Sequence, residues 1–349
     1  MATHIVGLDF GRDTVRAIEL QDAASNKPTV VRYHEVPLPA GAVRSGEVRE
    51  VNTVVTALKR LWAAGGFRSK DVVLGMGNQR VLVRELAVAR SSLKQIRESL
   101  PFHVQDLLPV PVSEALLDFF PISEGADEGN PTVNGLLIAA TKESVMANVL
   151  AVKHAGLNPV QVDLIPFALT RILSRGSASQ GTVALVDIGA STTQVVVVVD
   201  GVPVFVRMIP GGGHDITAAI AARLEIPEER AEGLKRASGL GGVNVTEENR
   251  PVVEVIHSSA GELLNSLRNT LHYFVNNRHG GAFNGILLTG GGAQLAGFRE
   301  ALSEVTKLPV TLVHPFGNVN VAKSVKTKSQ VSDAQAMTVA LGLALGSVA

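Results

Sequence analysis

The most constraining feature of this 349-residue sequence is a pattern that occurs twice. Each copy is an apolar run that ends in Asp-x-Gly, followed by a short polar turn and a second apolar run. The copies cover residues 4–20 and 183–199, and their aspartates are Asp9 and Asp187. Because two apolar runs joined by a short polar turn are typical of paired strands, each copy predicts a β-hairpin. The same unit twice in one chain indicates a duplicated domain.

Further apolar runs extend both copies. A third strand is predicted over residues 28–36 after the first copy and over residues 202–209 after the second. Apolar residues at helical spacing then predict helices over residues 51–62, 216–224 and 264–274. Strands that alternate with helices indicate an α/β protein, with helices layered over a mixed sheet.

An additional block, residues 86–158, separates the two copies. Within it, Ser91 and Ser92 are suitable caps for a helix that Pro101 ends or kinks. Residues 123–131 are rich in Gly, Asp and Glu and predict a loop between two short strands. A further helix is predicted after Thr141, which makes the block a small inserted α/β subdomain.

Composition limits the classes of function. Hydrophobic residues make up 46% and charged residues 18% of the chain, which argues against a disordered protein. Lys+Arg and Asp+Glu both total 32, so there is no basic footprint for nucleic acid. The absence of Cys excludes a disulfide framework, Cys-ligated zinc and a cysteine nucleophile. The N-terminus lacks the pattern of a signal peptide, and the longest apolar run, 337–349, is too short to span a bilayer; we therefore expect a soluble, cytoplasmic protein.

Three glycine-bearing turns follow apolar strands, and together they indicate phosphate chemistry. Two are the Asp-x-Gly turns, and the third is residues 290–292. Glycine lets a ligand approach the backbone closely, and consecutive N–H groups form a nest for anions. Asp9 and Asp187 would lie at the same place in the two halves, where two carboxylates would repel phosphates without a divalent cation between them. Mg²⁺ uses one or two carboxylates together with substrate phosphates, so the pattern predicts a Mg-nucleotide site.

Each turn on its own has a plainer interpretation. A single Asp-x-Gly or Gly-Gly-Gly run is most often only a tight turn, and the hydroxyls of Thr14, Ser191 and Thr192 can bond their own backbone. The three turns together, in this order, favour nucleotide binding. The sequence has no P-loop, no Rossmann fingerprint and no GxSxG elbow. Its His residues, His214 among them, show no metal-binding spacing and are expected to be surface or structural.

Residues 7–14 resemble the first phosphate motif of the actin, heat-shock chaperone and sugar-kinase superfamily. Residues 185–192 resemble its second phosphate motif, and residues 287–293 resemble its adenosine motif. Residues 231–235 are similar to the helix of bacterial actin relatives whose Glu and Lys approach the ribose and adenine. The resemblance implies an α/β, actin-like ATPase (ribonuclease-H-like) fold, with two duplicated lobes and the inserted small α/β subdomain.

The closer resemblance is to PilM, the family of actin-like proteins of type IV pilus assembly, which is related to the cell-division protein FtsA. Residues 106–119 resemble its pattern of a helix, then Pro-x-Pro, then an acidic strand. The inserted block lies where PilM and FtsA carry a subdomain of their own. Residues 158–173 and 333–346 are similar to the first and second connecting helices of the superfamily.

The resemblance also implies a division of the chain and a set of ligand contacts. The expected parts are a first lobe (1–85, with 159–180 and 333–349 packing back on it), the inserted subdomain (86–158) and a second lobe (181–332) that includes a smaller subdomain (212–280). ATP is expected to contact Gly11, Arg12, Asp13, Thr14, Gly189, Ala190, Ser191, Thr192, Thr193, Gly212, Glu232, Lys235, Gly290, Gly291, Gly292 and Gln294. Asp9 and Asp187 would hold Mg²⁺ through water. Arg12 and Asp13 stand where the family commonly has small residues, and Asp13 would repel phosphate if it pointed inward.

The PilM family implies a role as well. The N-terminal cytoplasmic tail of a PilN-like inner-membrane protein would bind a groove that involves the first lobe and the inserted subdomain. That tail would recruit the protein to the inner face of the cytoplasmic membrane, beside other pilus assembly components, without direct membrane contact. ATP would set the relative posture of the lobes. No catalytic residue stands out, so hydrolysis is expected to be slow or absent, and self-association stays open.

Two alternatives stay open at this point. The first is an FtsA-like division or filament protein; FtsA relatives end in a basic amphipathic helix, whereas residues 343–349 here have no basic face. The second is a small-molecule kinase of the same superfamily, which needs a carboxylate base at the acceptor hydroxyl. Asp163 is the nearest candidate for that base, and it fits a structural turn equally well.

Overall fold

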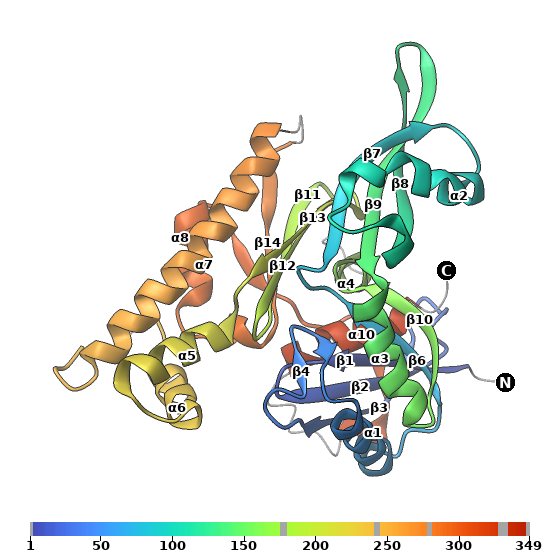
Figure 1. The fold of residues 1–349 in the computed structure, drawn as a ribbon. Helices are drawn as coiled ribbons and strands as arrows, with labels where there is room; N and C mark the ends of the chain where they lie inside the picture. Colours follow the sequence, from blue (N-terminus) through green and yellow to red (C-terminus); the bar gives the residue numbers. More distant parts are fainter. Residues whose placement is uncertain (1–2, 175–179, 241–244, 278–280, 327–333, 347–349) are drawn as a thin grey trace.

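The computed structural model describes residues 3–174, 180–240, 245–277, 281–326 and 334–346. Two lobes lie side by side, each built on its own sheet, and a smaller subdomain stands above the first lobe (Figure 1). The first lobe is drawn in blue with the red C-terminal helix, and the second in yellow to orange.

The first lobe contains a six-stranded sheet with the order β10-β6-β1-β2-β3-β16. Its strands are β1 (His4–Phe10), β2 (Thr14–Gln21), β3 (Thr29–Pro37), β6 (Asp71–Met76), β10 (Asn158–Leu164) and β16 (Asn320–Val321). The first three strands form an antiparallel meander, and β6 and β10 continue the sheet in parallel with β1. The predicted hairpin over 4–20 and the third strand over 28–36 are therefore confirmed.

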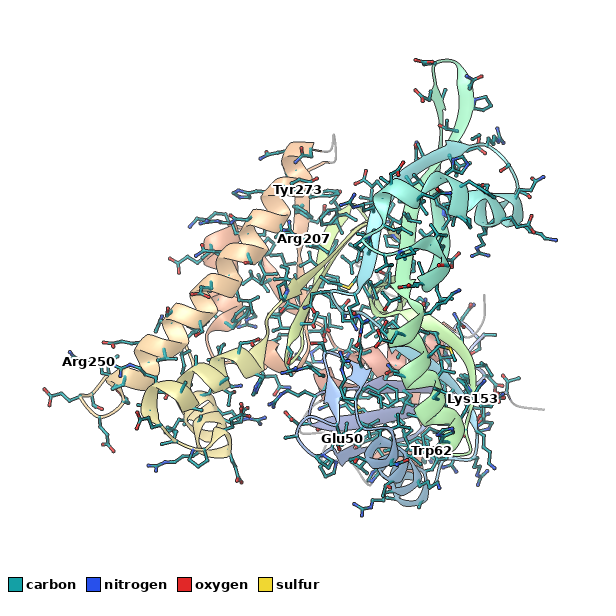
Figure 2. All side chains as sticks on the ribbon, in the orientation of Figure 1. Glu50, Trp62, Lys153, Arg207, Arg250 and Tyr273 are labelled. Atoms are coloured by element: carbon teal, nitrogen blue, oxygen red, sulfur yellow. The ribbon has the colours of Figure 1, made fainter. Side chains whose placement is uncertain are left out.

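Helices cover both faces of this sheet. On one face lie α1 (Val51–Gly65) and α3 (Lys142–His154), which pack side by side; the labelled Trp62 and Lys153 mark them in Figure 2. On the other face lie α4 (Ile165–Ser174) and α10 (Thr338–Leu345), which pack on each other. Two short strands, β4 (Val43–Arg44) and β5 (Glu47–Val48), form a hairpin beside α3.

The second lobe repeats the plan of the first. Its sheet has the order β13-β12-β11-β14-β15, made of β11 (Thr182–Ile188), β12 (Thr192–Val199), β13 (Val202–Pro210), β14 (Phe283–Thr289) and β15 (Val310–Leu312). Its helices are α5 (Gly213–Leu224), α6 (Glu228–Ser238), α7 (Arg250–Asn277) and α8 (Phe298–Thr306). The short α9 (Lys323–Lys326) follows β16 and packs on β3 of the first lobe.

The turns of the two leading hairpins share the same backbone hydrogen bond and the same strand register, which confirms the duplication. Gly11 N donates to Thr14 O over 3.0 Å, and Gly189 N donates to Thr192 O over the same 3.0 Å. In each hairpin the aspartate pairs with the residue seven positions on: Asp9 lies opposite Arg16, and Asp187 lies opposite Gln194.

The inserted subdomain is a three-stranded antiparallel sheet, β7-β9-β8, with one helix. Its elements are β7 (Val81–Ala89), α2 (Leu93–His103), β8 (Ala115–Asp127) and β9 (Asn130–Thr141). Ser92 forms the predicted N-cap through a capping box with Gln95, and Pro101 lies inside the last turn of α2. Helix α3 falls within the range 86–158 but packs on α1, β5, β6 and β10 of the first lobe. Short 3₁₀ turns occur at Gln105–Leu107, Val112–Glu114, Gly291–Gln294 and Ala334–Met337.

Two sequence predictions about this region are wrong. Residues 123–131 are a protruding hairpin and not a loop, because Glu128 (φ 47°) and Gly129 (φ 84°) adopt the left-handed pair that a tight hairpin turn needs. Residues 158–173 begin as strand β10, and only α4 is helical. Along β10 exposed Val160 and Val162 alternate with partly buried Pro159, Gln161 and Asp163, as in a strand with one face toward solvent, and β10 lies at the end of the sheet order.

Candidate functional site

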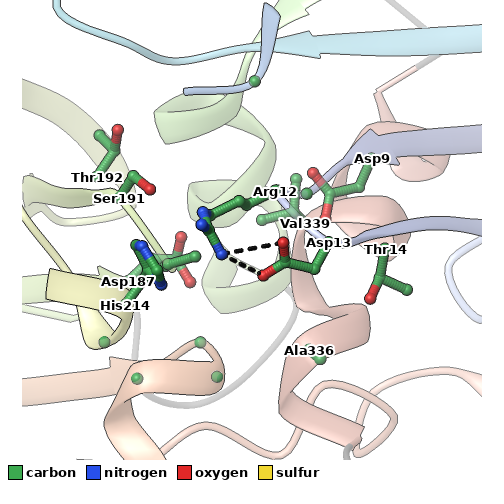
Figure 3. Close-up of a pocket in the computed structure, with 18 of the residues that line it drawn as sticks. Asp9, Arg12, Asp13, Thr14, Asp187, Ser191, Thr192, His214, Ala336 and Val339 are labelled. Carbon is green, nitrogen blue, oxygen red and sulfur yellow. Dashed lines mark hydrogen bonds and ion pairs between the residues drawn. The ribbon is translucent and has the colours of Figure 1, made fainter. Parts of the chain in front are cut away.

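A cavity of about 590 Å³ lies between the two lobes, where their matching turns face each other (Figure 3). It is lined by all of the residues predicted to hold the nucleotide or the metal except Thr193 and Gly212. Asp9, Arg12, Asp13 and Thr14 come from the β1–β2 turn of the first lobe, and the corresponding residues of the β11–β12 turn come from the second.

Thr193 and Gly212 support the turn without lining the cavity. The Thr193 side chain is fully buried, and its hydroxyl donates to Gly211 O over 2.8 Å. A Cβ on Gly212 would lie 2.3 Å from Gly189 O, so only glycine lets this segment pack against the second phosphate turn. Gly213 N and His214 N then donate to Gly189 O and Ala190 O over 2.9 and 2.8 Å. These bonds fix the backbone of the turn.

The two aspartates are held in an environment that opposes their negative charge. Asp187 is 7% exposed, and burial, with repulsion from Asp9, raises its pKa to about 7 against the attraction of Arg16. Burial likewise raises the pKa of Asp9, although Arg16 Nη1 lies 3.9 Å from Asp9 Oδ2. A divalent cation between them would reverse this penalty, because it favours the ionised form of both carboxyls.

Unpaired polar atoms in the cavity fit a bound Mg-nucleotide. Within the described part of the chain, three buried side-chain oxygens have no hydrogen-bond partner, Thr192 Oγ1, Gln194 Oε1 and Gln335 Oε1, and all three residues line this cavity. Buried polar atoms are normally satisfied, so orphans gathered in one cavity indicate where a polar ligand binds. Among the described residues no group of three or more His, Cys, Asp or Glu could hold a metal ion on its own.

The other end of the cavity has the features of a nucleoside pocket. Lys235 Nζ lies 2.6 Å from Glu232 Oε2 and donates to Gly213 O over 2.8 Å. Burial alone would raise the pKa of Glu232, but hydrogen bonds from Lys235, Thr217 and Arg236 outweigh it and lower the pKa to about 2. The carboxylate is therefore ionised and can accept from hydroxyl groups. Gly290, with φ 93°, lies so close to the second turn that a Cβ would be 2.4 Å from Ile188 O.

The unusual pair Arg12 and Asp13 forms a contact across the cleft. Arg12 Nη1 lies 3.0 and 2.9 Å from the two carboxylate oxygens of Asp13, and Arg12 Nη2 donates to Glu228 Oε2 on α6 over 3.2 Å (Figure 3 shows the Asp13 contact). His214 Nε2 lies 3.8 Å from the other oxygen of Glu228. The charge of Asp13 is thus paired with Arg12, which removes the expected repulsion of phosphate.

Several lining residues were missed by the sequence analysis. Among them are Arg16, Ser45, Gly46, Gly77, Gln194, His214 and Gln335. Arg16 and Gln194 lie at equivalent positions of the two hairpins, so the duplication itself could have identified them. His214 was expected to be surface or structural; it lines the cavity because the turn at 211–213 directs α5 into the cleft.

Asp163, the candidate base of a kinase, does not line the cavity. It forms an ion pair with Arg171 and accepts a hydrogen bond from Leu164 N over 2.8 Å. Arg171 Nε in turn donates to Gly342 O on α10 over 3.2 Å. Asp163 therefore ties β10 to the connecting helices.

Comparisons with known proteins agree with this geometry. Residues 7–348 match the family described as type IV pilus assembly protein PilM. The chain belongs to this family. A solved PilM–PilN type IV pilus biogenesis complex superimposes with a TM-score of 0.84 at 27% identity, covering 99% of this chain and 98% of the other.

The similarity extends to proteins outside the PilM family. MreB 5 of Spiroplasma citri bound to AMPPNP has a TM-score of 0.56 at 12% identity, with 97% of this chain and 94% of the other covered. FtsA of Bacillus subtilis is 26% identical over 260 residues, which are 67% of this chain and 58% of FtsA. The actin-like fold is thereby confirmed. No helix within the described residues is long and apolar enough to cross a bilayer.

The pKa of Asp187 predicts a pH dependence of nucleotide binding. Because metal binding requires the ionised carboxylate and the pKa lies at about 7, Mg-ATP affinity is expected to fall about ten-fold from pH 8 to pH 6. The free energy of unfolding changes with pH in the opposite direction. The contribution of Asp187 to it is fully present below about pH 4 and is lost as the pH rises through 7, because the folded protein holds the proton more tightly than the unfolded chain. Calorimetric titrations at pH 6, 7 and 8 measure the affinity, and Asp187→Asn gives the contribution of ATP's own titration. Equal pH profiles for both proteins would contradict the assignment.

Proposed function

We propose that this PilM-family chain binds Mg-ATP between its lobes and acts as a nucleotide-responsive platform of type IV pilus assembly. The observation that carries the proposal is the pair of matching Asp-x-Gly turns, which place buried Asp187, half-buried Asp9 and a set of unpaired polar atoms in one cavity. The backbone amides of residues 11–14 and 189–192 would hold the phosphates.

In this proposal Asp9 and Asp187 would hold Mg²⁺ through water. Without the metal, the two carboxylates would repel the phosphate groups. The bound cation would offset the negative charge of both. Glu232 and Lys235, with residues 290–294, would hold the nucleoside. Hydrolysis is expected to be slow or absent, because Asp163 is paired with Arg171 and the two cavity carboxylates serve the metal. No observation favours a division protein or a kinase.

The proposed partner is the N-terminal cytoplasmic tail of a PilN-like membrane protein. The chain is 27% identical, over nearly its whole length, to a PilM solved in a complex with PilN. In the cell, the tail would bring this chain to the inner face of the cytoplasmic membrane, beside other pilus assembly components. The chain itself would remain in the cytoplasm.

We place the tail at the β10 edge patch, which consists of Met146, Leu150, Val160 and Val162. Strand β10 ends the six-stranded sheet and, in the part of the chain that the structure describes, pairs only with β6, so its outer backbone groups can accept another strand. Val160 and Val162 are 49% and 37% exposed, and Met146 and Leu150 of the neighbouring α3 are 45% and 41% exposed. An extended tail would add backbone hydrogen bonds at the edge and place alternate apolar side chains on this patch.

A titration of the purified protein with a synthetic copy of the tail tests this placement. Val162→Lys is expected to weaken binding about ten-fold or more, because it puts a charge into an apolar contact. Val202→Lys is the matched control: Val202 is also 37% exposed, on the distant β13, and its variant should bind within about two-fold of wild type. Equal losses in both variants, or no loss in either, would move the tail away from β10. Absence of any binding would remove the PilN-like partner.

A further inference from the structure

A side chain of the second lobe lines the cavity and bonds the backbone of the first lobe. Gln194, on β12, is 3% exposed, and its Nε2 donates to Gly77 O over 3.0 Å. Its Oε1 is buried and, among the described residues, has no hydrogen-bond partner. Because Gln194 lies directly opposite Asp187 in the hairpin, the two side chains are on the same face of the sheet, toward the cavity.

The contact between Gln194 and Gly77 is so close that a side chain at position 77 would displace the Gln194 amide. A Cβ built on Gly77 would lie 2.3 Å from Gln194 Nε2 and 3.0 Å from its Oε1. The segment after β6 therefore approaches the second lobe through a glycine. A displacement of the Gln194 amide must move the Gly77 backbone or break the bond.

The residues that follow Gly77 lead directly into the inserted subdomain. Asn78, 2% exposed, donates to Ser45 O over 3.2 Å and to Glu47 Oε1 over 3.1 Å, and its Oδ1 accepts from Arg80 N over 2.9 Å. Strand β7 then begins at the next residue after Arg80.

Arg80 fastens the start of β7 to two neighbouring elements. Its guanidinium donates to Glu47 Oε2 over 3.1 Å and to Glu143 Oε2, at the start of α3, over 2.5 Å. Asn148 of α3 holds the same β4–β5 hairpin by donating to Gly46 O over 2.8 Å and accepting from Val48 N over 2.9 Å. Residues 77–80 thus join the cavity rim, α3 and the inserted sheet.

We propose that Gln194 couples the bound nucleotide to the posture of the inserted subdomain. Its Oε1 would accept a hydrogen bond from a water of the Mg-nucleotide, while its Nε2 holds Gly77 and thereby the start of β7. A buried amide oxygen without a donor is unfavourable, so a ligand that supplies the donor stabilises one orientation of the amide and of the segment attached to it. Gln194 is a positioning residue in this account. The proposal rests on the nucleotide binding proposed above.

The cysteine-free sequence makes the coupling measurable. Ser123→Cys, exposed on β8, and Ser258→Cys, exposed on α7, place spin labels on the inserted subdomain and the second lobe without background labelling. Saturating Mg-ATP is expected to shift the distance distribution between the labels. Gln194→Met, of similar size but without an amide, should bind Mg-ATP within about ten-fold of wild type and show no shift. Gly77→Ala, which disrupts the same contact from the first lobe, should also lose the shift.

Gln335→Met is the matched control. It removes another buried amide oxygen of the cavity, and at saturating Mg-ATP the shift should persist because no bond to Gly77 is lost. A full shift in Gln194→Met overturns the coupling role and leaves Mg-ATP binding standing. If Gln194→Met fails to bind Mg-ATP, the Gly77→Ala variant provides the test. A distance shift that persists in Gly77→Ala overturns the proposal, and loss of the shift supports it. A wild-type protein that binds Mg-ATP without any shift overturns both this coupling and the nucleotide-responsive role, and one that binds no Mg-ATP removes the proposed function itself.

Discussion

Asp187→Asn is expected to weaken Mg-ATP binding on the order of 100-fold and, at the same time, to stabilise the nucleotide-free protein at pH 8. Asparagine keeps the shape of the side chain but cannot supply the negative charge that Mg²⁺ requires. The pKa of about 7 shows that ionised Asp187 is unfavourable in this site, since both burial and Asp9 oppose its charge. Removing that charge should add about 1–3 kcal/mol to the free energy of unfolding at pH 8.

Calorimetry with Mg-ATP and thermal unfolding at pH 8 measure the two effects together. Asp163→Asn is the control, because Asp163 is also largely buried but is paired with Arg171 and does not line the cavity. It should lower the free energy of unfolding by about 1–3 kcal/mol, since Arg171 loses the carboxylate of its ion pair, and should leave Mg-ATP affinity nearly unchanged. If Asp187→Asn bound Mg-ATP as wild type does, or unfolded at a lower temperature, the metal-facing role of Asp187 would be wrong.

Gly7→Ala is expected to destabilise the protein by about 3 kcal/mol or more. A Cβ at Gly7 would lie 1.9 Å from Ala340 O and 2.6 Å from Ala344 N, both in the backbone of α10. Helix α10 is buried along its whole length and packs on β1, β2, β6 and α4, so it has no room to move away. A single methyl group must therefore separate the helix from the first sheet.

The midpoint of urea unfolding, compared with that of Gly261→Ala, measures this effect. Gly261 lies within helix α7, and an added Cβ there meets no atom within 4 Å. That control should gain about 0.5–1 kcal/mol, because alanine favours a helix more than glycine does. A Gly7→Ala protein as stable as wild type would show that α10 does not approach β1 as closely as described.

The parts of the fold that sequence reasoning predicted are those encoded locally. The hairpins that carry Asp9 and Asp187 were predicted because strand, turn and strand are contiguous and occur twice. The 123–131 hairpin was missed because its residues are mostly polar and exposed, so no apolar alternation distinguishes it from a loop. Strand β10 was taken for part of a connecting helix from family resemblance, and its exposed Val160 and Val162, two residues apart, show the period of a strand only in the structure.

The same distinction applies to the site. Most of the turn residues that were predicted to contact the nucleotide line the cavity between the lobes. Thr193 does not, and strand geometry explains why: successive side chains on β12 point to opposite faces, so Thr192 and Thr193 cannot both face the cavity. The Gln194–Gly77 and Arg12–Glu228 contacts join residues 117 and 216 positions apart, and only the tertiary fold brings them together.

We propose that this chain couples the binding of nucleotide to the binding of the PilN-like tail. A pair of calorimetric titrations tests this coupling most directly. One titrates the synthetic tail into the protein with and without saturating Mg-ATP, and the other titrates Mg-ATP with and without saturating tail. Coupling predicts that Mg-ATP changes the dissociation constant of the tail by about 5–150-fold and that the tail changes that of Mg-ATP by the same factor. A tail that binds with the same dissociation constant in both conditions would contradict a nucleotide-responsive platform.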